Sequence, residues 1–225
     1  MADVAFEGVT KVYKDGTIAV DGLDLYIQDG SFFVFLGPSG CGKTTLLNCF
    51  SGLDDLTSGD VLIEGVSLAS MDDNAKSRYR SRRMGFVFQT YNLLPVLTAV
   101  ENVELPLLVA RVPAKEARRK ALALMTAVEL DGWADHKPAQ LSAGQQQRVA
   151  IARALVNDPA IVWADEPTGN LDSETSAQIM DLLVRLNREQ GQTLVLVTHD
   201  AVVSARAHRI LRMRNGEIVE ETRGG

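Results

Sequence analysis

Hydrophobic and polar residues follow different periods along the chain, and these periods predict its elements. Apolar and polar positions alternate over residues 4–13 and 18–27, which is typical of antiparallel strands. Residues 58–68 indicate a further pair of short strands. Short apolar runs then predict strands that are mostly buried on both faces. These runs cover residues 31–37, 83–89, 160–165, 193–199 and 208–216.

Helical spacing of apolar residues occurs in three parts of the chain. Residues 43–53 follow a glycine-rich turn, and residues 173–191 form a longer helical pattern that stops at Gly191. Residues 95–157 are helical in character throughout, most clearly over 117–130. Apolar strands that alternate with helices predict an α/β fold with a parallel sheet covered on both faces. The long helical stretch interrupts that order, so we expect it to form a separate subdomain.

The length of 225 residues suits a single large domain with its own core. We expect residues 1–89 and 160–225 to form this core, including the N-terminal antiparallel part. Residues 90–159 are then an inserted helical subdomain.

Composition excludes several kinds of protein. No stretch approaches the roughly 18 apolar residues of a membrane span, and residues 1–8 lack the pattern of a signal peptide. A net charge of −6 argues against a broad nucleic-acid surface. We expect Cys41 and Cys49 to lie on one helix about 12 Å apart, beyond the roughly 7 Å limit for a disulfide. Two reduced thiols are therefore predicted.

The segment GPSGCGKT matches the phosphate-binding pattern G-x-x-x-x-G-K-[ST] between a predicted strand and a predicted helix. Gly40 and Gly42 permit close approach of a phosphate, whose oxygens Lys43 can reach, while Thr44 offers a hydroxyl to Mg²⁺. A plain glycine turn is the alternative, but every position and both flanks fit the motif. The predicted binding residues are Gly37, Pro38, Ser39, Gly40, Cys41, Gly42, Lys43, Thr44 and Thr45.

Acidic residues end the predicted strand IVWADE. A residue at the carboxyl end of a strand in an open α/β sheet faces the crevice where ligands bind. We expect Asp165 to hold Mg²⁺ and Glu166 to polarise an attacking water. A merely charged strand end is the alternative.

Two further predicted strands end in Gln89 and His199. Gln89 can offer its amide oxygen to Mg²⁺ or to the water, and His199 can donate to a γ-phosphate. Such residues at strand ends are usually only solvated. If the strands are neighbours, however, Gln89, Asp165 and His199 converge on one point.

A second anion site is predicted in the helical stretch. Ser142 followed by Gln145 is a capping-box pattern, and Ala143 and Gly144 leave the turn unobstructed. A helix start of this kind offers free N–H groups and a partial positive charge to an anion. An ordinary helix start is the alternative. Because the first loop already surrounds one set of phosphates, we expect this site to serve the nucleotide of another copy, in a head-to-tail dimer with two-fold symmetry.

The order of these motifs resembles that of the ATP-binding subunits of ABC transporters, over nearly the whole chain. That order is Tyr13, GPSGCGKT, Gln89, LSAGQ, IVWADE, GNLD and His199. The resemblance implies a P-loop NTPase core with a RecA-like sheet, ATP and Mg²⁺ as ligands, and an ATPase that drives an integral membrane permease. It implies a peripheral location at the cytoplasmic face of the cell membrane, with no nucleic-acid partner.

The resemblance also assigns roles to single residues. Tyr13 stacks on adenine, Gln89 links the nucleotide to the membrane partner, and Asp172 communicates across the dimer. Ser142 and Gly144 contact the partner copy's ATP. One departure is Ala143, which stands where the family usually has glycine. Longer matching segments resemble the macrolide-exporter and lipoprotein-releasing branch, in which coupling is export or mechanical.

Two other functions compete with an ABC transporter ATPase. A soluble ABC-type ATPase acting on DNA or ribosomes is the principal alternative, but the chain has neither a coiled-coil or zinc insertion nor a second cassette. A P-loop kinase has no use for LSAGQ or His199. The basic run at residues 76–83 has three possible interpretations. It forms a solvated face, it contacts the membrane partner or anionic headgroups, or it contacts nucleic acid.

Overall fold

The computed structural model describes residues 3–214 and 216–223. Its strands are β1 Val4–Val12, β2 Ile18–Ile27, β3 Phe32–Leu36, β4 Ser58–Ile63, β5 Val66–Ser67, β6 Met84–Phe88, β7 Ile161–Asp165, β8 Thr193–Thr198, β9 Arg209–Arg214 and β10 Glu217–Arg223. Its helices are α1 Lys43–Phe50, α2 Asp73–Arg83, α3 Ala99–Val109, α4 Ala114–Ala127, α5 Ala143–Leu155, α6 Ser173–Gln190 and α7 Ala201–Ser204.

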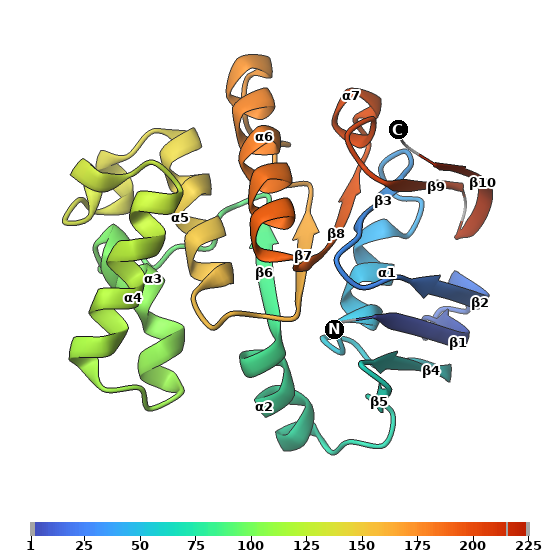
Figure 1. Cartoon of the computed structure of the whole chain (residues 1–225). Helices are drawn as coiled ribbons and strands as arrows, with labels where there is room; N and C mark the ends of the chain where they lie inside the picture. Colours follow the sequence, from blue (N-terminus) through green and yellow to red (C-terminus); the bar gives the residue numbers. More distant parts are fainter. Residues whose placement is uncertain (1–2, 215, 224–225) are drawn as a thin grey trace.

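Two sheets carry the fold (Figure 1). The larger has the order β10-β9-β3-β8-β7-β6, in which β9 to β6 are parallel and β10 pairs antiparallel with β9. The smaller is antiparallel, with the order β2-β1-β4-β5. Every residue of β3 is buried, as expected of a strand covered on both faces. The predicted α/β core with an N-terminal antiparallel part is confirmed.

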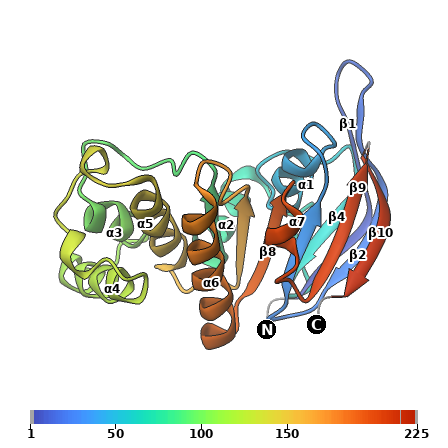
Figure 2. The same cartoon turned by 90° about the horizontal axis from the view of Figure 1, so that it is seen from above.

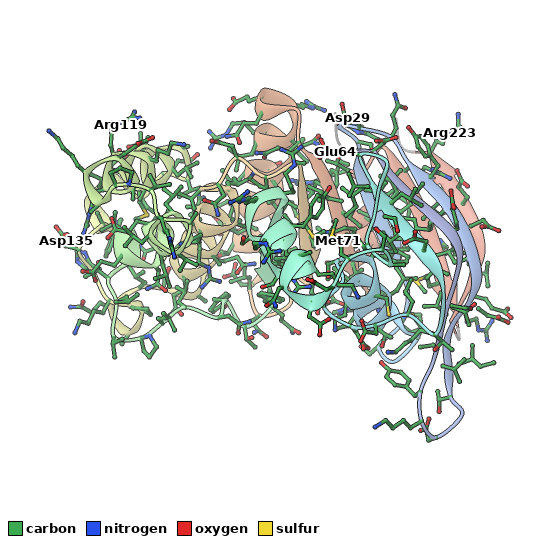
Figure 3. All side chains as sticks on the ribbon, turned by 90° about the horizontal axis from the view of Figure 1, so that it is seen from below. Asp29, Glu64, Met71, Arg119, Asp135 and Arg223 are labelled. Carbon is green, nitrogen blue, oxygen red and sulfur yellow. The ribbon has the colours of Figure 1, made fainter. Side chains whose placement is uncertain are left out.

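Helices α3, α4 and α5 pack together beside the large sheet, at one end of the molecule (Figures 1 and 2). Figure 3 marks this end by Arg119 and Asp135, with Arg223 at the opposite end on the sheet side. The inserted helical subdomain is therefore confirmed as part of the fold.

Two hydrophobic clusters hold these layers together. One lies between the large sheet and helices α3 to α6, and the other fills the space between the two sheets around α1. In the second cluster, the ring of Phe50 on α1 packs between Phe35 and Trp163, with centroids 5.8 and 6.5 Å away. Burial of these large apolar surfaces fixes α1, and hence the loop before it, against the sheet.

The structure corrects several sequence-based expectations. Cys41 lies in the turn before α1, so the two cysteines do not share a helix; both are free and buried, as expected of reduced thiols. The helix expected over 43–53 ends at Phe50. The strand expected over 208–216 spans Arg209–Arg214, and Asn215 lies outside the described residues.

The basic run lies on α2, an element that the apolar pattern did not predict. Lys76 pairs with Asp55 at 3.0 Å, Arg83 pairs with Glu64, and Arg80 donates to the carbonyl of Gly52. Several of these charges are therefore paired with neighbouring segments of the same chain.

Candidate functional site

A cavity of about 560 Å³ opens where the phosphate-binding loop meets the end of the large sheet. Its lining joins the antiparallel part, the loop and the strand ends. The lining residues are Tyr13, Thr17, Ile18, Ala19, Ser39, Gly40, Cys41, Gly42, Lys43, Thr44, Thr45, Gln89, Glu166, His199 and Gly216. Most of the predicted phosphate-binding residues, together with Tyr13, Gln89, Glu166 and His199, thus share one cavity.

The loop reaches this cavity in a conformation that requires glycine at its last position. Gly42 has φ 98° and directly precedes α1. A Cβ atom there would lie 2.7 Å from the carbonyl oxygen of Ala19, a distance that a backbone contact does not tolerate. The loop therefore packs directly on the antiparallel part, and α1 begins with its N–H groups at the cavity.

Lys43 is the central positive charge of the cavity. Its side chain is 5% exposed, and its ammonium donates to the carbonyls of Gly37 at 2.7 Å and Pro38 at 2.9 Å. The Oε1 atom of Glu166 lies 3.9 Å away. A buried ammonium held by the loop's own carbonyls is placed to meet a phosphate that enters the loop.

Asp165 lies at the end of β7, where Thr44 Oγ1 donates to its Oδ1 atom over 3.1 Å. Burial raises the pKa of this carboxyl above its ordinary value, with a further contribution from the charge of Glu166. Thr44 and Lys43 act against that rise. An oxygen pair of hydroxyl and desolvated carboxylate is the donor chemistry that Mg²⁺ prefers.

Glu166 follows directly and has an unusual backbone. Its φ is 46°, which is rare for a residue with a side chain. The amide of Glu166 donates to Val197 O at 3.0 Å on β8, and its Oε2 atom lies 3.0 Å from Nδ1 of His199. The carboxylate is therefore held between Lys43 and His199 and faces the cavity.

The convergence predicted for three strand ends follows from the sheet order, because β6, β7 and β8 are neighbours. Gln89 directly follows β6. Its Nε2 atom donates to Asn170 Oδ1 over 3.3 Å, and Asn170 Nδ2 donates to the backbone carbonyl of Gln89 over 2.9 Å. Gly169 leaves room for it, since a Cβ there would lie 2.7 Å from Gln89 Nε2. Gln89 and His199 line the cavity, and Glu166 joins them there in place of the predicted Asp165, whose carboxylate instead accepts from Thr44.

Tyr13, just after β1, also lines this cavity. Figure 2 shows the β1–β2 turn projecting beyond the sheets. Tyr13 is 42% exposed, and its hydroxyl lies 2.7 Å from Thr45 Oγ1 on α1. This bond fixes the ring near the start of α1. The sequence predicted only that the face of the ring stacks on adenine, not that the hydroxyl has a partner.

The second anion site lies elsewhere in the chain. Ser142 caps α5, and the reciprocal bonds with Gln145 form the predicted capping box. Among the residues that the structure describes, neither these two nor Gly144 lines the cavity. The turn is open at Ala143, which is exposed, but not at Gly144, where a Cβ would lie 2.6 Å from Thr175 Cγ2 on α6.

Asp172 starts α6 next to this turn. Its carboxylate accepts bonds from the amide of Thr175 at 2.9 Å and from its hydroxyl at 2.7 Å, and these bonds lower the pKa of Asp172. Asn170 and Gly216 were not predicted from the sequence, because their contacts with Gln89 and Ala19 join distant segments, and Thr175 was also missed, although its partner Asp172 is three residues away. Gln147, considered below, was also missed, although it belongs to the glutamine run after LSAGQ.

Comparisons with known proteins identify the family of the chain. A model of the family described as ABC transporter matches residues 20–169. The chain is 47% identical to the uncharacterized ABC transporter ATP-binding protein MJ0796 of Methanocaldococcus jannaschii, across 97% of this chain and 96% of that protein. It is 44% identical to the macrolide export ATP-binding/permease protein MacB of Brucella melitensis, across 97% of this chain and 34% of that protein.

A solved structure is similarly close. The chain matches the dimeric post-hydrolysis state of the MJ0796 ATP-binding cassette bound to ADP and Pi, with a TM-score of 0.89 and 46% identity over 98% of both chains. The MacB match confirms the resemblance to the macrolide-exporter branch. Within the described residues, no helix is both long and apolar enough to cross a membrane. This chain therefore belongs to the ABC transporter family and is one of its ATP-binding, ATP-hydrolysing cassettes.

Proposed function

We propose that the chain binds Mg-ATP in the 560 Å³ cavity, and that two copies close head to tail around two ATP molecules to drive a membrane permease. One observation carries this proposal. The cavity gathers the loop, the acidic strand end and His199, whereas the capping box at Ser142 lies outside it. One chain thus holds two phosphate-binding features that do not meet, and a second copy brings them together.

ATP lies across the cavity from Tyr13 to the strand ends in this proposal. The ring of Tyr13 stacks on adenine, and the loop from Gly37 to Thr45 surrounds the phosphates with N–H groups. Lys43 then exchanges its bonds with the Gly37 and Pro38 carbonyls for bonds to phosphate oxygens. This exchange replaces neutral acceptors by charged ones, which form stronger hydrogen bonds.

Magnesium fits the donor set on this chain. Thr44 and Asp165 would hold the ion, since their oxygens already lie 3.1 Å apart, and Gln89 can add its amide oxygen. The raised pKa of Asp165 shows a carboxylate that burial penalises and that a cation would relieve. The ion supplies charge neutralisation at the phosphates when it is bound.

Glu166 is the proposed general base. Its carboxylate accepts a proton from the attacking water, and His199, 3.0 Å from Oε2, holds the carboxylate and reaches toward the γ-phosphate. Asp165 is occupied by Thr44 and the metal, so the two neighbouring acids take different tasks.

The second copy supplies Ser142, Gly144 and Gln145 to the other chain's γ-phosphate. The open end of α5 offers N–H groups and a partial positive charge there. Asp172 bonds Thr175, which in turn lies against Gly144 of this turn. Asp172 is therefore placed to respond when the two copies close. The dimeric ADP–Pi structure of the MJ0796 cassette supports this arrangement.

The permease is proposed to be a separate integral membrane protein. MacB, by its printed name, combines ATP-binding and permease functions, and this chain spans only 34% of it. We place the chain at the cytoplasmic face of the cell membrane, held there by that partner.

Size-exclusion chromatography with light scattering tests the proposal. Glu166→Gln keeps the size of the side chain and removes the base, so ATP binds and persists. We expect the variant to double its mass in Mg-ATP and to remain monomeric in Mg-ADP. A variant that stays monomeric in both, at high protein concentration, contradicts the proposed closure of two copies.

A further inference from the structure

Gln147 is the one fully buried residue of the run Gln145–Gln147, which follows the signature turn. It sits on α5, one turn after the capping box. Its Nε2 atom donates to the carbonyl oxygen of Pro167 over 2.6 Å. Pro167 directly follows Glu166, so this bond joins the helix that carries the signature to the backbone of the proposed base.

The amide oxygen of Gln147 has no hydrogen-bond partner among the described residues. A buried polar atom without a partner costs stability, and an apolar side chain of the same length avoids that cost. Packing alone therefore does not explain a glutamine at this position. What the amide group of Gln147 does contribute is the hydrogen bond from its Nε2 atom to Pro167 O.

The backbone that receives this bond is strained. Glu166 has a positive φ, and a residue before proline is restricted further. Such a conformation persists only where surrounding contacts impose it. Three bonds do so here: from Glu166 N to Val197 O, from Gly169 N to Glu166 O, both 3.0 Å, and from Gln147 to Pro167 O.

These three bonds differ in origin. The first belongs to the large sheet, and the second lies within the loop itself. Only the bond from Gln147 comes from the helical subdomain. A change in the orientation of α5 is therefore transmitted to the Glu166–Pro167 segment through this residue.

We infer that Gln147 is a positioning residue: it holds Glu166 in its catalytic geometry and makes that geometry depend on the placement of α5. The inference rests on the proposed role of Glu166 as the base. In the proposed dimer, the start of α5 lies over the partner's ATP, whereas Gln147 acts on Glu166 of its own chain. Engagement of one ATP thereby adjusts the base that serves the other.

Steady-state ATPase kinetics of Gln147→Met test this inference. Methionine keeps length and apolar volume but donates no bond to Pro167. Because small displacements of a catalytic group can reduce rates by about 100-fold, we expect kcat to fall about 10- to 100-fold with KM for ATP within about twofold. We expect Tm to be unchanged or higher, since the unpaired amide oxygen is removed.

Matched variants separate positioning from folding. Gln146→Met makes the same change one residue earlier, where the side chain donates to Leu141 O instead of to the segment of Glu166, and should keep the wild-type kcat. Gln147→His places a ring N–H near the lost donor and should recover most of kcat. If Gln147→Met does not fold, Gln147→Leu takes its place as the variant that lacks the donor.

Several outcomes would overturn the inference. A folded Gln147→Met with wild-type kcat excludes positioning, and so does a Gln147→His that is folded but no better than Gln147→Met. If Gln147→Met prevents ATP-dependent dimerisation in the Glu166→Gln background, the residue acts on closure instead of on the base. A wild-type chain without ATPase activity would instead refute the proposed function itself.

Discussion

Tyr13 offers a quantitative test of how the chain holds the base of ATP. Its hydroxyl lies 2.7 Å from Thr45 Oγ1, so the ring has two separable contributions: a stacking face and a bond that orients it. Tyr13→Phe removes only the bond. Tyr13 is 42% exposed, so water can replace the lost partner of Thr45. The lost bond should therefore cost about 0.5–1 kcal/mol of binding free energy, at the low end for a hydrogen bond, or about 2- to 5-fold in Kd.

Tyr13→Ala removes both contributions. Stacking of a base on an aromatic ring is worth about 1–3 kcal/mol by alanine substitution. Together with the lost bond, this amounts to about 1.5–4 kcal/mol, or about 10- to 1,000-fold in Kd. Isothermal titration calorimetry with Mg-ADP measures these changes without hydrolysis.

Thr45→Val is the matched control, because it removes the same bond from the other side. We expect it to weaken Mg-ADP binding as much as Tyr13→Phe, and the double variant Tyr13→Phe, Thr45→Val to be no weaker than either alone. Fully additive losses would show that the two hydroxyls act separately. A Tyr13→Phe loss equal to that of Tyr13→Ala would refute stacking.

Two further predictions concern ionisation. Because burial raises the folded-state pKa of Asp165, the folded chain retains this proton more tightly than the unfolded chain, and the resulting stability is lost as pH rises through the raised pKa. Asp165→Asn should therefore raise Tm at pH 7 in EDTA, with the gain vanishing at acidic pH; a lower Tm at pH 7 would contradict this. Burial also raises the pKa of Cys49 to about 11, so at pH 8 about one thiol in a thousand is ionised. Labelling read by mass spectrometry should modify Cys49 only after unfolding, and rapid labelling of the native chain would contradict its burial.

The sequence was most informative where chemistry and local geometry coincide in one segment. The loop, the acidic strand end and the capping box at Ser142 are each contiguous, so their residue order determined their local structure. The sequence could only make the convergence of Gln89, Asp165 and His199 conditional on strand order. The sheet makes β6, β7 and β8 neighbours, but Glu166 and not Asp165 lines the cavity with the other two.

Elements without a strong apolar period were missed for a physical reason. Helix α2 has no buried residue, and β10 is mostly exposed at the edge of the large sheet, so neither shows the hydrophobic pattern of a buried element. The Gln147–Pro167 bond was missed because it joins segments that are distant in the sequence and are brought together only by packing of α5 on the core.

The central claim is that the start of α5 serves the nucleotide of a second copy. Ala143 allows a direct test, because it is exposed and is the first residue of α5. An acid at this position favours the helix by about 0.3–1 kcal/mol yet repels a partner's phosphate. Gly144 is less suitable, since any side chain there meets Thr175.

The measurement is the mass of Ala143→Asp in the Glu166→Gln background in Mg-ATP, by light scattering, with Ala143→Ser as the neutral control. The account predicts a stable monomer for Ala143→Asp with unchanged Mg-ADP affinity, and a dimer for Ala143→Ser. An Ala143→Asp chain that still dimerises, or one that loses Mg-ADP binding as a monomer, would contradict it.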